Sequence, residues 1–131
     1  MDNGPLVKEE IEAGAILARE FDRFAPLKAA FWLRASDEEQ RYLYLTSDCF
    51  DDTNYFDAYK EVVRLVQALQ LPELDLFRVK IVAGNNPLAE AAAEQIRLYP
   101  NSTGRRFGSG AFGDLSIDDG YVYPQPLPVA A

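Results

Sequence analysis

Apolar residues recur at helical spacing in three segments of the chain. The first stripe consists of Val7, Ile11, Gly14, Ala18, Phe21 and Ala25, widened by Leu17 and Phe24. The second consists of Phe56, Tyr59, Val63, Val66 and Leu69, with Val62 beside it. The third consists of Leu88, Ala92, Ile96 and Tyr99. Steps of three and four residues place such positions on one side of a helix, so the pattern predicts three amphipathic helices.

The predicted helices have recognisable ends. Pro26 and Pro72 close the first two, because proline cannot continue a helix. Asp52 or Thr53 is the expected N-cap of the second helix. Asn86 is the expected N-cap of the third, with Pro87 in its first turn. In the first helix, Gly14 and Ala18 would allow a close approach to the layer beneath.

Three segments between the helices read as strands: residues 28–36, 41–47 and 76–84. Phe31 and Trp32 are neighbours in the first. Because successive side chains of a strand point to opposite faces, both faces of this strand need cover, which predicts a central position with a layer on each side.

The same alternation assigns faces in the other two strands. In the second, the alternation places Tyr42 and Tyr44 on one face and Leu43 and Leu45 on the other. In the third, Phe77, Val79 and Ile81 share one side.

The end of the chain predicts two more strands. "GRRFGSGAFGDLSI" (104–117) and "GYVYP" (120–124) are joined by an expected turn at Asp118, Asp119 and Gly120. The order is α-β-β-α-β-α-β-β, which predicts an α+β fold with a five-stranded mixed sheet and helices packed on it. The third strand, the helix of about a dozen residues within 85–100 and the strand that follows have the spacing of a parallel crossover.

Composition fits one globular domain. The chain has 131 residues, of which 48% are hydrophobic and 26% charged. We expect one domain over residues 1–123 and an extended tail over 124–131, where every second residue from Pro124 to Pro128 is proline. The single Cys49 fits a reducing, cytoplasmic location, and no apolar run is long enough to span a membrane.

Charge and the missing histidine narrow the function classes. The 21 acidic and 13 basic residues give a net charge of −8, which opposes nucleic-acid binding. The chain contains no histidine, so Ser–His–Asp and Cys–His catalysis and histidine-ligated metal sites are impossible within it. These residues predict no cofactor, and they favour a protein that is not an enzyme.

The glycines 108, 110 and 113 spell G-x-G-x-x-G, and "GSGAFG" looks like the glycine loop of protein kinases. A dinucleotide site needs a helix directly after the glycines, but β-like residues follow. A kinase needs a lysine on the next strand and a distant catalytic Asp, and the 18 residues after Gly113 contain no lysine. We therefore interpret the glycines as positions of bulges or close backbone approach. A small-anion site remains as an alternative, with Arg105, Arg106, Gly108 and Gly110 as candidates.

A cluster of acids follows the second strand. Asp48, Asp51 and Asp52 lie within five residues, and clustered carboxylates can bind magnesium or calcium. The cluster lacks the alternating acids and terminal glutamate of a calcium loop, so capping and solvation of a loop are the favoured interpretation.

A resemblance covers residues 7–123. "IEAGAILAREF", "AAFWLR", "YLYLTSD", "NPLAEAAAEQIR" and "GRRFGSGAFGDLSIDDGYVY" resemble a family of small, uncharacterised bacterial proteins, in the spacing of the helix, the Phe–Trp strand and the final Tyr-x-Tyr strand. The resemblance implies no activity and no catalytic residue. It supports the interpretation of the glycine segment as a strand.

Two functions remain open on these residues. The first is a non-catalytic domain that binds an unknown protein or forms a homo-oligomer, which the acidic surface and the many tyrosines favour. The second is a small-molecule or anion binder, or a hydrolase, that uses Asp48, Asp51 and Asp52 with Arg105 or Arg106.

Overall fold

A computed structural model describes residues 8–51, 53–71, 74–98 and 104–124. Val7, Asp52, Tyr99 and the tail from Gln125 onward, on which some expectations fall, lie outside these residues. The elements are α1 (Lys8–Phe24), β1 (Ala29–Ala35), β2 (Tyr42–Ser47), α2 (Tyr55–Leu69), the short 3₁₀ turn η1 (Leu76–Arg78), β3 (Val79–Ala83), α3 (Pro87–Leu98), β4 (Arg105–Phe107), β5 (Gly110–Phe112) and β6 (Leu115–Val122). The fold is α+β, as predicted.

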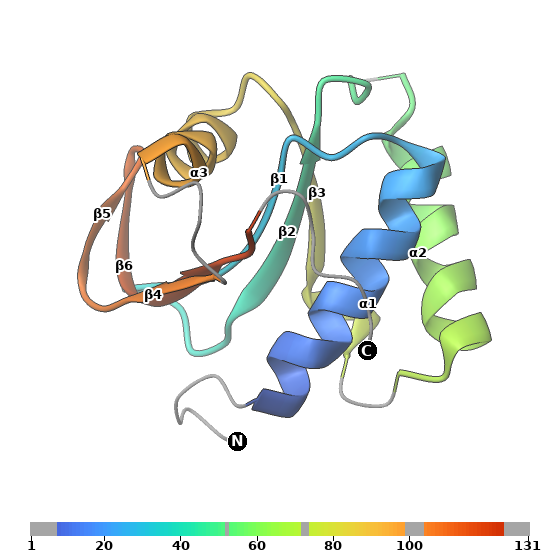
Figure 1. The fold of residues 1–131 in the computed structure, drawn as a ribbon, viewed down its shortest axis with the longest axis horizontal. Coiled ribbons are helices and arrows are strands. Elements are labelled where there is room, and N and C mark those ends of the chain that lie inside the picture. Colours follow the sequence, from blue (N-terminus) through green and yellow to red (C-terminus); the bar gives the residue numbers. More distant parts are fainter. Residues whose placement is uncertain (1–7, 52, 72–73, 99–103, 125–131) are drawn as a thin grey trace.

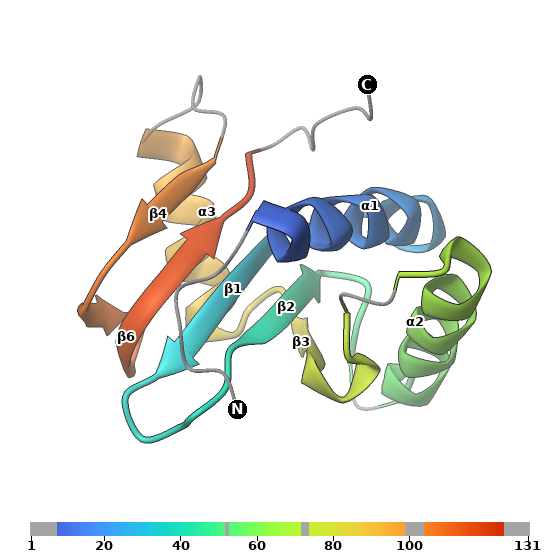
Figure 2. The same cartoon turned by 90° about the horizontal axis from the view of Figure 1, so that it is seen from below.

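The strands form one mixed sheet in the order β3-β2-β1-β6-β4, with β5 also paired to β6. The pairs β1–β2, β1–β6, β4–β6 and β5–β6 are antiparallel, and β2–β3 is parallel. Helices α1 and α2 lie on one face of the sheet and α3 on the other (Figures 1 and 2). The sheet therefore has six strands where the sequence predicted five.

The central strand confirms the expectation for Phe31 and Trp32. Both side chains are buried, and they belong to separate apolar clusters. Trp32 packs in the cluster beneath α1 and α2, and Phe31 packs on the side of α3. Phe31 stacks on Tyr44 with ring centroids 5.1 Å apart. As predicted, β1 lies within the sheet with a layer on each side.

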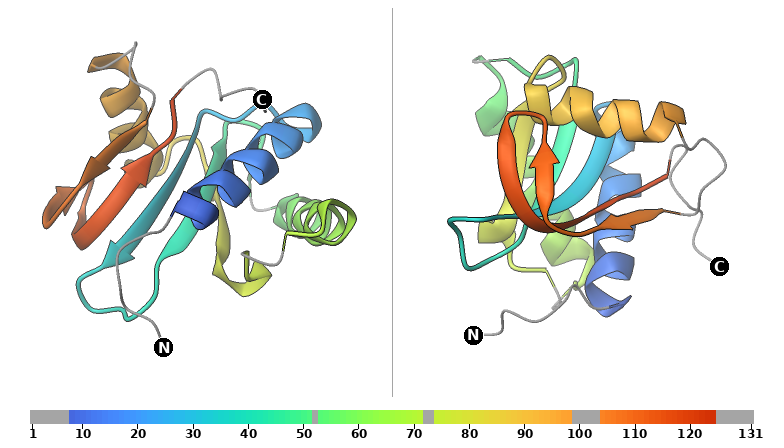
Figure 3. Two further views of the ribbon diagram at one scale, coloured as in Figure 1. Left: turned by 60° about the horizontal axis from the view of Figure 1, so that its bottom comes forward. Right: turned by 90° about the vertical axis from the view of Figure 1, so that its left-hand side faces the viewer.

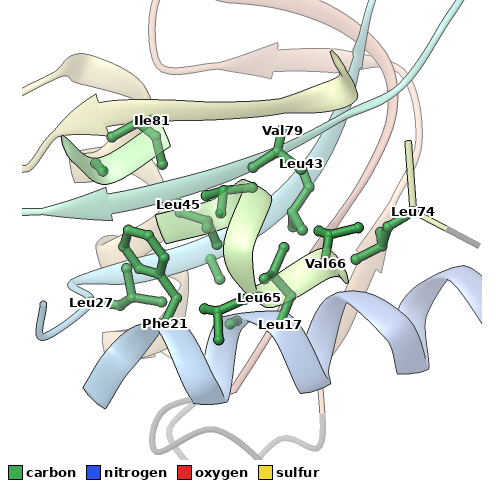
Figure 4. Packing of buried hydrophobic residues seen from close by; sticks show 14 of the residues in the cluster. Leu17, Phe21, Leu27, Leu43, Leu45, Leu65, Val66, Leu74, Val79 and Ile81 are labelled. Carbon is green, nitrogen blue, oxygen red and sulfur yellow. The ribbon is translucent and has the colours of Figure 1, made fainter. Parts of the chain in front are cut away.

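The larger cluster joins α1 and α2 to the sheet. Figure 4 shows Leu17 and Phe21 of α1 and Leu65 and Val66 of α2 directed toward side chains of β2 and β3. In β2, Leu43 and Leu45 lie in this cluster, whereas Tyr44 and the half-buried Tyr42 lie with the opposite one, which confirms the predicted alternation.

Gly14 allows α1 to approach the sheet closely, as predicted. A side-chain carbon at this position would lie 2.3 Å from the Tyr123 hydroxyl oxygen and 3.0 Å from Trp32 Nε1. Trp32 Nε1 donates a hydrogen bond of 2.9 Å to that hydroxyl, which in turn donates one of 2.6 Å to the Ile11 carbonyl oxygen. Burial raises the pKa of Tyr123 well above its ordinary value, so the hydroxyl keeps the proton that it donates.

The C-terminal part of the sheet, where the last turn was expected, differs from the prediction. Residues 118–120, expected to form a turn, lie inside β6. The turn is instead at Gly113 and Asp114, between the paired residues Phe112 and Leu115. Gly113 adopts φ +62°, the left-handed conformation that such a two-residue hairpin turn requires of its first residue.

Ion pairs explain how two charged residues, Asp118 and Asp119, can lie within strand β6. The pairing of β1 with β6 shifts by one residue between Arg34 and Ala35, a β-bulge at Asp118. Arg34 Nη1 lies 3.3 Å from Asp118 Oδ2, and Arg34 Nε lies 3.6 Å from Asp119 Oδ2. Arg41, which is buried, contributes Nη1 at 3.8 Å from Asp119 Oδ2. Arginines from β1 and from the β1–β2 loop thus stabilise both aspartates within β6.

Two further expectations for α2 and α3 need correction. The N-cap residue of α2 is Asn54, and its side chain makes no capping hydrogen bond. Parallel pairing joins β2 and β3, the strands on either side of α2. The strands before and after α3, β3 and β4, run in opposite directions, so the crossover expected there does not form. The cap of α3 is as predicted, because the Leu88 N–H donates to Asn86 Oδ1 at 2.8 Å.

Candidate functional site

The acidic cluster lies at the carboxyl ends of the two parallel strands. Asp48 and Asp51 line a cavity of about 380 Å³ together with Phe50, Tyr55 and Ala83–Asn85. The Asp48 carboxylate lies against Gly84, where a side-chain carbon would be 1.9 Å from Asp48 Oδ1. In sheets with parallel strands, this end is where ligands commonly bind.

The hydrogen bonds of Asp51 are local. Its Oδ1 accepts from the Thr53 backbone N–H at 2.8 Å and from the Thr53 hydroxyl at 2.5 Å. These bonds hold the pKa of Asp51 below its ordinary value, which makes its carboxylate a weak base. Asn54 completes the loop by donating to the Cys49 carbonyl oxygen at 2.6 Å. The sequence favoured capping and solvation of a loop: Asp51 is exposed, but its hydrogen bonds stay within the loop and do not cap α2.

Metal binding gains no support from the geometry of this cluster. Within residues 8–51, 53–71, 74–98 and 104–124, no three His, Cys, Asp or Glu side chains lie together in a group that could hold a metal ion. Asp52, the third acid of the predicted set, lies outside these residues.

The arginine and glycine candidates lie at the opposite edge of the sheet. Arg105 and Arg106 are in β4, and three strands separate β4 from β3. The structure therefore does not bring them to Asp48 and Asp51, and the predicted combined site of acids and arginines does not form. Arg105, Arg106, Gly108 and Gly110 are all exposed.

The three glycines have different roles. Phe107 pairs with Gly120 and Gly110 pairs with Ile117, so two residues lie between the two pairs on each side. β4 and β5 are therefore two parts of one strand, interrupted at Gly108 and Ser109. A side-chain carbon at Gly108 or Gly110 would meet nothing within 4 Å, whereas at Gly113 it would lie 2.9 Å from the Pro87 carbonyl oxygen. The expected close approach to a helix is confirmed at Gly113 only.

The outer surface of α2 carries apolar side chains that the sequence assigned to the core. Phe56 is 75% exposed, Tyr59 38% and Val63 36%. The buried residues of α2 are Ala58, Val62, Leu65 and Val66. Of the predicted stripe, Val66 is buried and Leu69 half-buried, so the prediction was wrong for Phe56, Tyr59 and Val63.

Exposed apolar residues of α2 form a shallow groove. It has a volume of about 410 Å³ and is lined by Phe56, Tyr59, Lys60, Val63, Arg64 and Gln67; we call it the α2 groove. A second hollow, lined by Val66, Gln67, Gln70, Leu71 and Leu74, adjoins it at Gln67. The apolar side chains of this second hollow, Val66, Leu71 and Leu74, are buried, so the exposed apolar side chains are those of the α2 groove.

A hydrogen bond to the sheet fixes one wall of the α2 groove. The Ile81 backbone N–H of the edge strand β3 donates to the Tyr59 hydroxyl at 3.0 Å. This bond orients the tyrosine ring and also occupies a backbone donor at the open edge of the sheet. Edge strands with occupied donors are poor templates for pairing with a further strand.

Phe77 adds to the exposed aromatic surface. It was expected to share one side of a strand with Val79 and Ile81, but it lies in η1 and is 83% exposed. The turn η1 packs against α2, and Figure 2 shows β3 and the turn before it beside that helix. An aromatic side chain buries about 150–250 Å², so Phe56, Tyr59 and Phe77 together expose about 300–500 Å².

The tyrosines divide between the core and the surface. Tyr44 and Tyr123 are buried, while Tyr59 lies at the surface. The sequence did contain a signal for the α2 groove. The helix carries more apolar residues than one buried face can accommodate.

No family model, curated protein or solved structure matches this chain. The resemblance to a family of small bacterial proteins stays a prediction. No helix within the described residues is long and apolar enough to cross a bilayer.

Proposed function

We propose that this chain is a non-catalytic domain that binds another protein through the α2 groove. The observation that carries the proposal is the exposure of Phe56, Tyr59 and Val63 on a helix whose opposite face is already packed in the core. Clustered exposed aromatic residues are costly to keep in water and are typical of interaction sites. The cytoplasmic location expected from Cys49 belongs to the same proposal.

The exposed area fits such an interface. A standard interface buries about 800 Å² on each partner. The aromatic side chains of Phe56 and Tyr59 supply about a quarter of that area, and Val63, Lys60, Arg64 and Gln67 line the groove beside them. Aromatic residues also dominate the binding energy of many interfaces, because they combine a large apolar area with few rotatable bonds.

A displayed library of random peptides tests the proposal. Peptides selected on the wild-type protein are expected to lose binding to a Phe56→Ser variant, because serine removes the exposed ring. They should keep binding to Leu98→Ser, a matched control in which a half-exposed apolar residue of α3 is replaced. If no peptide is enriched, or if the enriched peptides bind both variants equally, the α2 groove is not the binding site.

A second candidate function is the binding of a small polar ligand in the cavity of Asp48 and Asp51. The position at the carboxyl ends of β2 and β3 favours it. A thermal-shift screen of cationic and hydroxylated metabolites should then find a compound that raises the melting temperature of the wild type but not of Asp48→Asn. If no compound separates the two proteins, this second function fails.

A further inference from the structure

The α2 groove carries positive charge on an acidic protein. Its charged lining residues are Lys60 and Arg64, and none of its six lining residues is acidic. The whole chain has a net charge of −8. Lys60 Nζ lies 5.4 Å from the centroid of the Phe56 ring, so a positive charge stands directly over the exposed aromatic side chain.

Arg64 also faces outward. Its side chain is 62% exposed, while that of Glu61, to which it is hydrogen bonded, is only 14% exposed. The bonds run from Arg64 Nε to Glu61 Oε1 at 2.9 Å and from Nη2 to Oε2 at 2.6 Å. The ion pair neutralises the arginine, so Lys60 supplies the net positive charge beside the apolar residues, and the outward-facing Arg64 covers the Glu61 carboxylate.

A second copy of this chain fits the α2 groove poorly. In a two-fold symmetric contact, the same surface of each copy meets the other. The lining of the α2 groove contains no carboxylate, so the groove of a second copy would bring Lys60 no opposite charge, and complementary charge is what favours association.

Addition of a strand is also disfavoured. The Tyr59 hydroxyl occupies the backbone N–H of Ile81 at the open edge of β3, so a further strand would first have to displace it. The α2 groove, in contrast, runs along a helix of 15 residues, about 22 Å long. Its apolar positions 56, 59 and 63 are spaced by three and four residues, which suits contact with a second helix.

We propose that the α2 groove binds an acidic amphipathic helix of another protein. Apolar side chains of that helix would contact Phe56, Tyr59 and Val63, and its flanking carboxylates would contact Lys60 and Arg64. This inference rests on the proposed function, because it names the chemistry of the partner for the same surface.

Two synthetic helical peptides of equal length test whether the α2 groove prefers an acidic helix. Both carry leucine at the same helical positions, and the flanking positions are all glutamate in one peptide and all lysine in the other. With the full chain, fluorescence anisotropy is expected to show about tenfold tighter binding of the glutamate peptide, since opposite charges favour the complex. The preference should shrink as salt is added, because ions screen exposed charges.

A charge reversal at Lys60 sharpens the test. Lys60→Glu is expected to remove or invert the preference for the glutamate peptide. Lys8→Glu, at an exposed position of α1, changes the net charge by the same amount and should leave the preference intact. Circular dichroism shows whether each variant is folded.

The outcomes separate the two proposals. A preference for glutamate that depends on Lys60 and on Phe56 supports the acidic helix. Equal binding of both peptides through Phe56, a preference for lysine, or Phe56-dependent self-association seen by light scattering overturns the acidic helix and leaves the interaction surface standing. If neither peptide binds and the displayed library yields no Phe56-dependent binder, the proposed function fails as well.

Discussion

Helices α1 and α2 lie side by side on the same face of the sheet but use their apolar residues differently (Figure 3). In α1, the buried residues are Ala13, Gly14, Leu17, Ala18 and Phe21, and Phe24, at 48% exposed, is its only described large hydrophobic that is exposed. In α2, Phe56, Tyr59 and Val63 face water although the core side of the helix is complete. The difference indicates that one apolar side of α2 packs in the core, and the exposed side is the surface for which we propose a partner.

Truncation of a core side chain of α2 should have the largest effect on the free energy of unfolding. Leu65→Ala removes buried atoms from the contact with α1 and the sheet, and we expect a loss of about 2–5 kcal/mol in the free energy of unfolding. Urea denaturation measures it. Val63→Ala on the exposed side is the matched control, expected to cost about 0.5 kcal/mol or less. Similar losses for the two variants would mean that both sides of α2 are packed.

The contact between α1 and the sheet should be the next most sensitive. Gly14→Ala places a methyl group 2.3 Å from the Tyr123 hydroxyl oxygen, and we expect a destabilisation of about 1–3 kcal/mol. Tyr123→Phe removes that oxygen, so Gly14→Ala should cost less in the Tyr123→Phe background. A double-mutant cycle measures this coupling. Additive effects would show that the hydroxyl does not limit the approach of α1.

A substitution at Tyr44 should have a smaller effect, on the pH dependence of stability. Burial, aided by Glu38 and Tyr42, raises the pKa of Tyr44 from 10.0 to about 12. A folded-state pKa above the unfolded value gives stability that is fully present below pH 10.0 and is lost as the pH rises toward about 12. Tyr44→Phe should therefore lose less stability than the wild type over this interval in alkaline urea titrations. Parallel curves would contradict the assignment.

Much of the fold could be predicted from local patterns. Phe31 next to Trp32 required a strand covered on both faces, and Gly14 in an apolar stripe required a close contact. Each of these signals depends on residues near in sequence. The turn expected at Asp118 and Asp119 failed because its outcome depends on distant residues: Arg34 and Arg41 neutralise the two acids inside β6.

The candidate site could not be predicted for a related reason. Phe56, Tyr59 and Val63 have the same helical spacing as Ala58, Val62 and Leu65, so periodicity alone cannot decide which side of α2 meets the sheet. Tertiary packing decides it, since Ala58, Val62, Leu65 and Val66 share one buried cluster with Val79 and Ile81 of β3. The larger aromatic residues are then left outside.

The most direct test of the account combines stability and binding in one double variant, Phe56→Ser with Phe77→Ser. We predict that its free energy of unfolding stays within about 0.5 kcal/mol of the wild type, because both rings are largely exposed. We also predict that its binding of the glutamate peptide is lost. A stability loss of more than about 2 kcal/mol, of the size seen when core residues are truncated, or binding that persists unchanged would contradict the claim that these rings serve a partner and not the fold.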